Sequence, residues 1–323
     1  MTIAILSTLL AATLAVVILR RRSAALPVAV PDARSLHDAP VVRVGGLAIL
    51  AGIVAGLPAW SVPPGITPSL AWAVALATFA VAAISALDDW RGVRPATRLA
   101  VQALAAAGAA WAMPVSAVIA LPMVLAIVWM ANLFNFMDGS DGLAASAAIA
   151  GFTAYAAGAF AAGSDPVPFV LIAVACAPFL AVNLPPARMF MGDVGAVTLG
   201  FMAAVLGAAG IVGGIWPAWL PLLAFAAPIL DATLTLARRA WRRERVYEAH
   251  KAHYYQRFHQ MGAGHGGTLA LYASLSAATS ATAAACALAA PRLGWAALGA
   301  WMIVIAALFA AIDYHWRRRS PTP

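Results

Sequence analysis

The sequence predicts an all-α protein that crosses a membrane many times. Of its 323 residues, 63% are hydrophobic and only 10% are charged, and the mean hydropathy is +0.88. Soluble domains carry about a quarter charged residues, so this chain cannot cover a surface that faces water. The composition excludes a soluble globular protein, a coiled coil, a disordered chain and a nucleic-acid-binding domain.

Apolar runs mark the candidate spans. A membrane helix needs roughly 20 predominantly apolar residues, and about eleven runs approach that length. The whole chain, residues 1–323, is therefore expected to form one integral-membrane domain. The runs cover residues 2–19, 45–60, 68–87, 98–113, 117–136, 142–162, 167–184, 194–213, 216–237, 268–288 and 294–313.

The charged residues predict the orientation. The net charge is +8, and with the N-terminus outside and the C-terminus cytoplasmic, every one of the 20 Lys and Arg except Arg292 falls on the cytoplasmic side. This is the distribution that the positive-inside rule describes. All 12 Asp and Glu except Asp165 also lie at or near that face. Because acidic residues contribute little to topology, we expect them to form a shared polar site near the inner surface.

An acidic pair ends the third candidate span. Asp88 and Asp89 are adjacent, and two carboxylates this close repel each other unless a cation lies beside them. The alternative is that the pair has no function and lies at a helix end that is exposed to water.

The run from Asn132 to Gly142 is more specific. Asn132, Asn135 and Asp138 recur every three residues, which gathers them on one side of a helix end. Together with Asp141, they offer the carbonyl and carboxylate oxygens that Mg²⁺ prefers. A calcium loop is the alternative, but the run lacks the later glutamate of an EF-hand.

Two further acids lie in apolar surroundings. Asp193 begins an apolar run between two glycines, a position that the helix dipole favours whether or not the residue is functional. Asp231 lies inside an apolar run, where a carboxylate is costly and is either functional or paired with an arginine of a neighbouring helix. Arg188 either anchors the membrane edge or binds a phosphate.

The loop over residues 238–267 combines arginines with histidines. Its arginines suit attraction to anionic lipids. His250 and His253 stand nearly one helical turn apart, and with Arg257 they offer a site for a diphosphate. Zinc is disfavoured, because the loop has no cysteine and a third ligand would have to be His259 or His265.

Taken in order, these motifs resemble the polyprenyl-phosphate N-acetylhexosamine-1-phosphate transferases, a glycosyltransferase 4-like family that initiates lipid-linked glycan assembly in bacteria. The resemblance extends over most of the chain. Its matching residues are Asp32-Ala33-Arg34-Ser35-Leu36-His37, Pro40, Arg43, Gly45-Gly46, Asp88-Asp89, Arg98, Gln102, Asn132, Asn135, Asp138-Gly139, Asp141-Gly142, Met191-Gly192-Asp193, Gly195, Asp231, Arg238-Arg239 and His250 to Arg257.

The resemblance implies a reaction. The family transfers a sugar-1-phosphate from a UDP-N-acetylhexosamine to undecaprenyl or another polyprenyl phosphate, releases UMP and uses Mg²⁺, with Mn²⁺ as a substitute. It implies a site at the cytoplasmic face of the bacterial inner membrane, formed by loops 20–44, 88–97, 137–141, 185–193 and 238–267. Family members form homodimers in some cases, and no motif here decides that point.

The resemblance also implies residue roles. Asp88, Asp89 and Asp193 would be catalytic, with the first two positioning or activating the lipid phosphate. Asn135 and Asp193 would hold Mg²⁺. The substrate-binding residues would be Arg43, Asn132, Asp138, Asp141, Arg188, Asp231, His250, His253 and Arg257.

Of two departures from the family pattern, the first bears on the substrate and the second on a local turn. The block from His250 to Arg257 lacks the clustered histidines of the peptidoglycan enzyme and is closer to the O-antigen branch, which often handles 6-deoxy-N-acetylhexosamines. This disfavours a muramoyl-pentapeptide substrate and favours initiation of an O-antigen-like polysaccharide, as in lipopolysaccharide synthesis. Val44 stands where the family usually has a third glycine.

Two other classes of function remain as alternatives. A secondary transporter with an acidic ion site at the cytoplasmic face would predict two related halves with paired broken helices, and the asparagine–aspartate motif has no repeat in either half. A non-catalytic scaffold would be favoured by loss of Asp88, Asp89 or Asp193, and all three are present.

Overall fold

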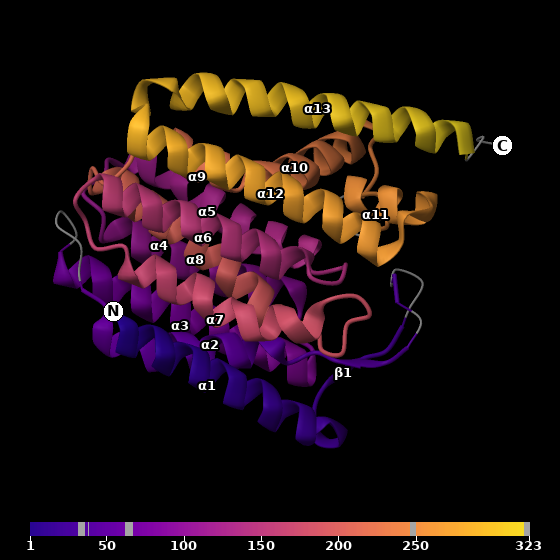
Figure 1. Cartoon of the computed structure of the whole chain (residues 1–323), viewed down its shortest axis with the longest axis horizontal. Helices are drawn as coiled ribbons and strands as arrows, with labels where there is room; N and C mark the ends of the chain where they lie inside the picture. Colours follow the sequence, from indigo (N-terminus) through magenta and orange to yellow (C-terminus); the bar gives the residue numbers. More distant parts are fainter. Residues whose placement is uncertain (32–35, 38, 62–66, 246–249, 320–323) are drawn as a thin grey trace.

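The computed structural model describes residues 1–31, 36–37, 39–61, 67–245 and 250–319. Residues 32–35, which belong to the first matching motif, lie outside the described residues. Long helices that run roughly side by side make up the molecule, with the N-terminus at one end of the bundle and the C-terminus at the other (Figure 1). The helices are α1 (Thr2–Arg21), α2 (Gly45–Gly56), α3 (Pro68–Arg91), α4 (Pro95–Trp111), α5 (Ala117–Met137), α6 (Leu143–Ala161), α7 (Val167–Asn183), α8 (Asp193–Val212), α9 (Trp219–Ala224), α10 (Ala226–Trp241), α11 (Tyr254–Phe258), α12 (Gly264–Ala289) and α13 (Gly294–Arg319).

The described residues form almost no sheet. Strands β1 (Val28–Ala29) and β2 (Val41–Val42) pair antiparallel, with Val28 opposite Val42. This small hairpin lies at the end of the bundle that also carries α11 (Figure 1). The prediction of an all-α fold is therefore confirmed.

Within the part of the chain that the structure describes, seven helical runs are long and apolar enough to cross a membrane. The two shorter apolar helices are Gly45–Ala59 and Val167–Asn183. The chain is thus a multi-pass membrane protein. The sequence predicts eleven spans, and seven helical runs among the described residues meet the length and hydropathy of a span. The seven are α1, α3, α5, α6, α8, Tyr254–Ala289 and Pro291–Arg319.

The predicted span over residues 216–237 is not one helix. Helix α9 ends at Ala224 and α10 begins at Ala226, with a break at Phe225. The cause is Pro228, because a proline ring clashes with the carbonyl group four residues earlier, which here belongs to Ala224. Helix α10 then extends to Trp241, beyond the predicted end of the span.

Two of the predicted loops are largely helical. Within residues 238–267, α10 ends at Trp241, α11 follows at Tyr254–Phe258, a π-helical turn covers His259–Ala263, and α12 begins at Gly264. Within residues 88–97, the first four residues belong to α3 and the last three to α4. Sequence alone missed these extensions because charged residues at helix ends interrupt the hydropathy signal without ending the helix.

Helices α6 and α8 lie at the centre, and most of their residues are buried. A Cβ atom at Gly46 would overlap the backbone of Gly195, so the starts of α2 and α8 touch through glycines. The N–H of Gly46 donates to the carbonyl oxygen of Met191 at 2.8 Å, and the N–H of Gly45 donates to that of Phe190 at 2.9 Å. These contacts hold the segment before α2 against the segment before α8.

Candidate active site

Four aspartates and two arginines meet where five helices begin or end. Asp88 and Asp89 come from the end of α3, Asp138 follows α5, and Asp193 begins α8. Arg98 lies in the first turn of α4, and Arg43 follows β2, close to the start of α2.

Asp193 is held between the two arginines. Its Oδ1 atom is 3.0 Å from Nη2 of Arg43, and its Oδ2 atom is 2.6 Å from Nη1 of Arg98. Arg98 also contacts Asp88, which accepts the N–H of Val93 at 2.6 Å. The Nε atom of Arg98 is buried and has no hydrogen-bond partner among the described residues. An additional oxygen acceptor would satisfy it, because buried N–H groups are rarely left unpaired.

Asp89 connects α3 to the start of α8. Its carboxylate lies 2.5 Å from Nη2 of Arg43. It also accepts the backbone N–H groups of Asp193 at 3.0 Å and Val194 at 2.9 Å. The first N–H groups of a helix have no partner inside the helix, and a negative charge there is favoured by the dipole. Asp89 therefore fixes the position of α8 and of Asp193 with it.

Asp138 closes the other side of the group. Its carboxylate accepts the N–H of Gly192, a residue with φ +74° that leaves no room for a Cβ atom beside Asp89. Burial raises the pKa of Asp138 well above its usual range, and the neighbouring Asp193 carboxylate adds to the effect. Burial opposes the charge on Arg43, but the carboxylates of Asp89 and Asp193 raise the pKa of Arg43.

The two candidate asparagines have different surroundings. The Asn132 amide donates to Gln102 Oε1 at 2.7 Å and to the Val128 carbonyl oxygen at 2.8 Å, which ties α5 to α4. Asn135 is half-buried, and its side chain makes no hydrogen bond with any residue that the structure describes. Its oxygen is therefore available to a ligand.

A second polar group surrounds Asp141, in the turn between α5 and α6. Asp141 Oδ2 accepts the N–H of Ala187 at 2.9 Å, and its Oδ1 lies 3.4 Å from Nδ1 of His265. His265 Nε2 lies 2.9 Å from the Leu36 carbonyl oxygen. Asn183 joins the same turn to the start of α8, because its Oδ1 accepts the N–H of Gly142 and its Nδ2 donates to the Met189 carbonyl oxygen, both at 2.8 Å.

Asp231 is fully buried and holds the short helix α11. Its carboxylate accepts the N–H groups of Tyr254 and Tyr255, each at 3.0 Å, and the hydroxyl of Tyr272. The ring of His253 lies beside the same carboxylate, with Nδ1 at 3.2 Å from Oδ1. The carboxylate thus caps α11 as Asp89 caps α8, and no arginine of a neighbouring helix is paired with it among the described residues.

Helix α11 packs on the end of α5. The Tyr255 hydroxyl donates to the Phe136 carbonyl oxygen at 2.8 Å, and the Phe136 and His253 rings lie 5.6 Å apart. His250 stacks on His253 at 4.9 Å. The histidine block is therefore adjacent to the turn that carries Asp138.

Arg257 belongs to a third charged group. Its Nη1 atom lies 2.5 Å from Oδ1 of Asp313 on α13, and Nη1 of Arg238 lies 2.7 Å from the same oxygen. Arg238 also contacts the hydroxyl of Tyr254. One carboxylate faces two guanidinium groups, so a positive charge is left over on this side.

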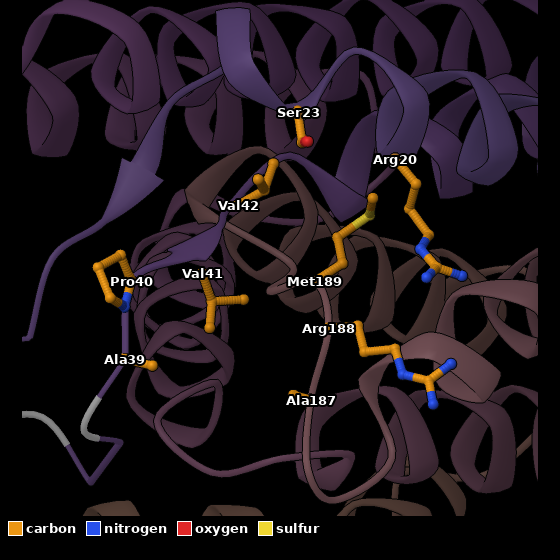
Figure 2. Close-up of a pocket in the computed structure, with 9 residues that line it drawn as sticks. All are labelled: Arg20, Ser23, Ala39, Pro40, Val41, Val42, Ala187, Arg188 and Met189. Atoms are coloured by element: carbon orange, nitrogen blue, oxygen red, sulfur yellow. The ribbon is translucent and has the colours of Figure 1, made fainter.

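Arg188 is set apart from these groups. It lines a cavity of about 410 Å³ together with Arg20, and none of the four central aspartates lines that cavity (Figure 2). The predicted site residues thus divide between the central group, this cavity and three flanking groups, which surround Asp141, Asp231 and Arg257.

Sequence reasoning did not single out Asn183 or Asp313, and it named His265 only as a possible third zinc ligand. Each acts through a partner at least 40 residues away in the chain, or in a different helix. A sequence signal exists only for Asn183, which ends α7 just before a proline-containing turn and the Met-Gly-Asp motif.

Comparison with known proteins gives a consistent result. The model for glycosyl transferase family 4 matches residues 71–211. The chain is 30% identical over 288 residues to a decaprenyl-phosphate N-acetylglucosaminephosphotransferase of Mycobacterium tuberculosis, covering 74% of this chain and 70% of the relative. It is 28% identical over 254 residues to a probable undecaprenyl-phosphate N-acetylglucosaminyl 1-phosphate transferase of Bacillus subtilis, covering 73% and 70%.

A more distant match is to the phospho-N-acetylmuramoyl-pentapeptide-transferase of Rhodopseudomonas palustris, 30% identical over 227 residues that cover 54% of this chain and 62% of that one. The ordered motifs, the apolar helices and these similarities agree. The chain belongs to the polyprenyl-phosphate N-acetylhexosamine-1-phosphate transferases, a family of membrane-embedded sugar-phosphate transferases.

Proposed function

We propose that this protein transfers N-acetylhexosamine-1-phosphate from a UDP-sugar to undecaprenyl phosphate and releases UMP. An oxygen of the lipid phosphate would form a bond to the phosphorus that carries the sugar. The bond from that phosphorus to the bridging oxygen would break, and UMP would leave with the electron pair. The relatives' names support the general reaction, and the donor nucleotide and the acceptor lipid are our assignment.

The observation that carries the proposal is the pairing of Asp193 with Arg43 and Arg98 at the start of α8. Two anionic phosphates must approach each other in this reaction, and the two guanidinium groups, together with the metal ion assigned below, would offset their repulsion. The unpartnered Nε of Arg98 is suited to a phosphate oxygen. Arg98 contacts Asp88, so we assign the lipid phosphate to this side of the site.

The donor set fits Mg²⁺. The four central aspartates outnumber the two arginines, so the group carries excess negative charge when it is ionised. Among the described residues, no three His, Cys, Asp or Glu side chains form a ready-made metal cage. This suits Mg²⁺, which usually takes one or two carboxylates and fills its remaining positions with waters and phosphates.

We assign Asp193 and Asn135 as the residues that would hold Mg²⁺, or Mn²⁺ in its place. The ion would neutralise part of the negative charge on the diphosphate of the sugar nucleotide. Asp89 would act by positioning Asp193, because its carboxylate holds the start of α8. Asp138, whose raised pKa reflects burial beside other carboxylates, would ionise more readily beside a bound cation.

The flanking groups would bind the rest of the sugar nucleotide. We assign Asp141 to the nucleotide, where Ala187 and His265 fix its carboxylate. His253 and Arg257 would contact the diphosphate or the sugar. Asp231 would act through α11, since it caps the helix that carries Arg257.

The proposed site would face the cytoplasm, where UDP-sugars are made, in the inner membrane of a bacterium. The N-terminus would lie outside and the C-terminus inside. The one-sided distribution of arginines supports this orientation, as does the location of the two termini at opposite ends of the bundle (Figure 1).

The product would begin an O-antigen-like polysaccharide. The block from His250 to Arg257 lacks clustered histidines, and this departure from the peptidoglycan enzyme supports the assignment. Its two tyrosines do not, because Tyr254 and Tyr255 are buried and their hydroxyls contact Arg238 and Phe136. We therefore favour N-acetylglucosamine or a 6-deoxy relative over the muramoyl-pentapeptide as the sugar.

One assay tests the reaction. Purified protein in detergent is incubated with undecaprenyl phosphate, Mg²⁺ and UDP-N-acetylglucosamine that carries label in the sugar. We expect labelled lipid and UMP to form in equal amounts, and neither to form after chelation of the metal or omission of the lipid. Release of UMP without labelled lipid would contradict the transfer and indicate hydrolysis.

A further inference from the structure

The cavity that Arg188 shares with Arg20 is separate from the central aspartates. It has a volume of about 410 Å³ and lies between the end of α1, strand β2 and the segment before α8. Its apolar wall includes Val41, Val42 and Met189. In Figure 2 the two arginines lie on one side of Met189, with Val41 and Pro40 on the other.

The charged side chains that line this cavity are both positive. None of the nine described residues that line it is acidic. Neither guanidinium group makes a hydrogen bond or ion pair with another described residue. The hydroxyl of Ser23 adds a further donor beside Arg20. Two unpaired arginines and a hydroxyl around one hollow are suited to a phosphate group, which arginine binds through paired N–H donors.

Helix α1 connects the cavity to the lipid phase. Its 20 residues span about 30 Å, which matches the hydrocarbon core of a bilayer. One face packs on the protein through Ala4, Thr8, Ala12 and Val16. The opposite face exposes Leu6, Leu10, Leu14 and Ile18, each between 51% and 61% exposed.

This exposed stripe ends at the level of Arg20. Arg20 follows Val16 by one turn and therefore lies on the packed face of α1, toward the cavity. A lipid whose acyl chains lie beside α1 in the same leaflet would have its headgroup at this depth. The cavity is larger than a bare phosphate ion needs, and its apolar wall suits the glycerol of a headgroup. We propose that it binds the phosphodiester headgroup of an anionic phospholipid from the same leaflet.

A lipid bound there would also contact the frame of the candidate active site. Val42 lines the cavity and directly precedes Arg43, and its carbonyl oxygen accepts the N–H of Phe190 at 2.8 Å. Met189 lines the cavity too, and its carbonyl oxygen accepts a hydrogen bond from Asn183. An occupied cavity would therefore stabilise the segments that place Arg43 and Asp193, since a ligand that binds only the folded state stabilises it.

Lipid binding can be measured without the reaction. The full-length protein in detergent is titrated with phosphatidylglycerol, and bound lipid is counted by native mass spectrometry. The Arg20→Gln/Arg188→Gln variant is compared with an Arg21→Gln/Arg22→Gln control, which loses the same charge from exposed residues that do not line the cavity. A third variant, Arg20→Lys/Arg188→Lys, keeps the charge.

We expect the glutamine variant to bind its tightest phosphatidylglycerol about tenfold more weakly than the wild type, as loss of charge-assisted hydrogen bonds predicts. The control should bind like the wild type, and the lysine variant should lie between them. Phosphatidylcholine should bind all four proteins weakly and equally.

A competition experiment with inorganic phosphate distinguishes a lipid site from a site for a free anion. Failure of phosphate to displace phosphatidylglycerol supports a lipid site, whereas displacement by phosphate alone would make the cavity a free-anion site and contradict the proposal. Equal phosphatidylglycerol binding by the wild type and the glutamine variant would also contradict it. No sugar nucleotide or polyprenyl phosphate is present, so these outcomes are independent of the proposed transfer.

Discussion

The carboxylate of Asp89 caps the helix that Asp193 begins. It accepts the N–H groups of Asp193 and Val194 at 3.0 and 2.9 Å, and it pairs with Arg43. Its neighbour Asp88 contacts Arg98 and the N–H of Val93. Asp89 therefore caps a helix, whereas Asp88 binds the adjacent loop and Arg98. The sequence alone does not distinguish these two roles.

Substituting the two aspartates separately should reveal this difference. Asp89→Asn should lower the free energy of unfolding by about 1–3 kcal/mol, because an amide cannot accept both N–H groups and keep the ion pair with Arg43. Asp88→Asn should cost less than half as much. Thermal unfolding in detergent measures both, and equal losses would contradict the capping role.

Asp193→Asn should reduce turnover by about 100-fold or more and weaken its dependence on Mg²⁺. The amide keeps the volume of the side chain but loses the charge that the proposed metal needs. Turnover is measured across a Mg²⁺ titration, with Asp165→Asn in the α6–α7 connection as the matched control. Turnover close to that of the wild type at saturating Mg²⁺ would remove Asp193 from the metal site.

Asp231→Asn should loosen α11 while leaving the central aspartates in place. The buried carboxylate accepts the N–H groups of Tyr254 and Tyr255, and an amide would turn a donor toward one of them. Amide hydrogen exchange over residues 250–258 should become faster, and the KM for the sugar nucleotide should rise more than kcat falls. Unchanged exchange in that segment would show that α11 does not depend on Asp231.

Topology provides an independent check. A reporter that is active only in the cytoplasm, fused after Arg319, should be active, and a reporter that is active only outside should not. The expectation rests on the one-sided arginines. Activity of the outside reporter would reverse the membrane orientation and move the proposed site to the other face.

Sugar choice should be selective but incomplete. UDP-N-acetylglucosamine and its 6-deoxy relatives should be used, and the muramoyl-pentapeptide nucleotide should be refused. Apolar fit to a 6-methyl group discriminates by about 1–3 kcal/mol, or roughly 10–200-fold, so some use of related sugars is expected. Turnover is compared across these nucleotides and their 4-epimers. Preferred use of the muramoyl-pentapeptide nucleotide would overturn the sugar assignment without affecting the family.

Hydropathy predicted the positions of most helices because each apolar run must be enclosed by lipid or by other helices. It did not predict the break at Phe225, although Pro228 carries that information, because an apolar average is insensitive to one missing hydrogen bond. It also underestimated α10 and α12, whose ends continue into charged and glycine-rich sequence.

The acids of the central group could be selected from sequence, since few carboxylates occur in so apolar a chain. Their partners could not. The contact of Asp141 with His265, and that of Arg257 with Asp313, join segments that only the packing of α12 and α13 brings together. Nor does sequence distinguish a carboxylate that caps a helix, such as Asp231, from one that is free to bind a ligand.

The central charges come from five separate helix ends, and this has a consequence for the newly made chain. Until α2, α3, α4, α5 and α8 have all been inserted and docked, Asp193 has neither its two arginines nor the cap from Asp89. On the proposed function, a half-inserted chain would therefore have no turnover and could not cleave the sugar nucleotide before assembly is complete. Appearance of turnover during synthesis would mark the moment at which membrane assembly is complete.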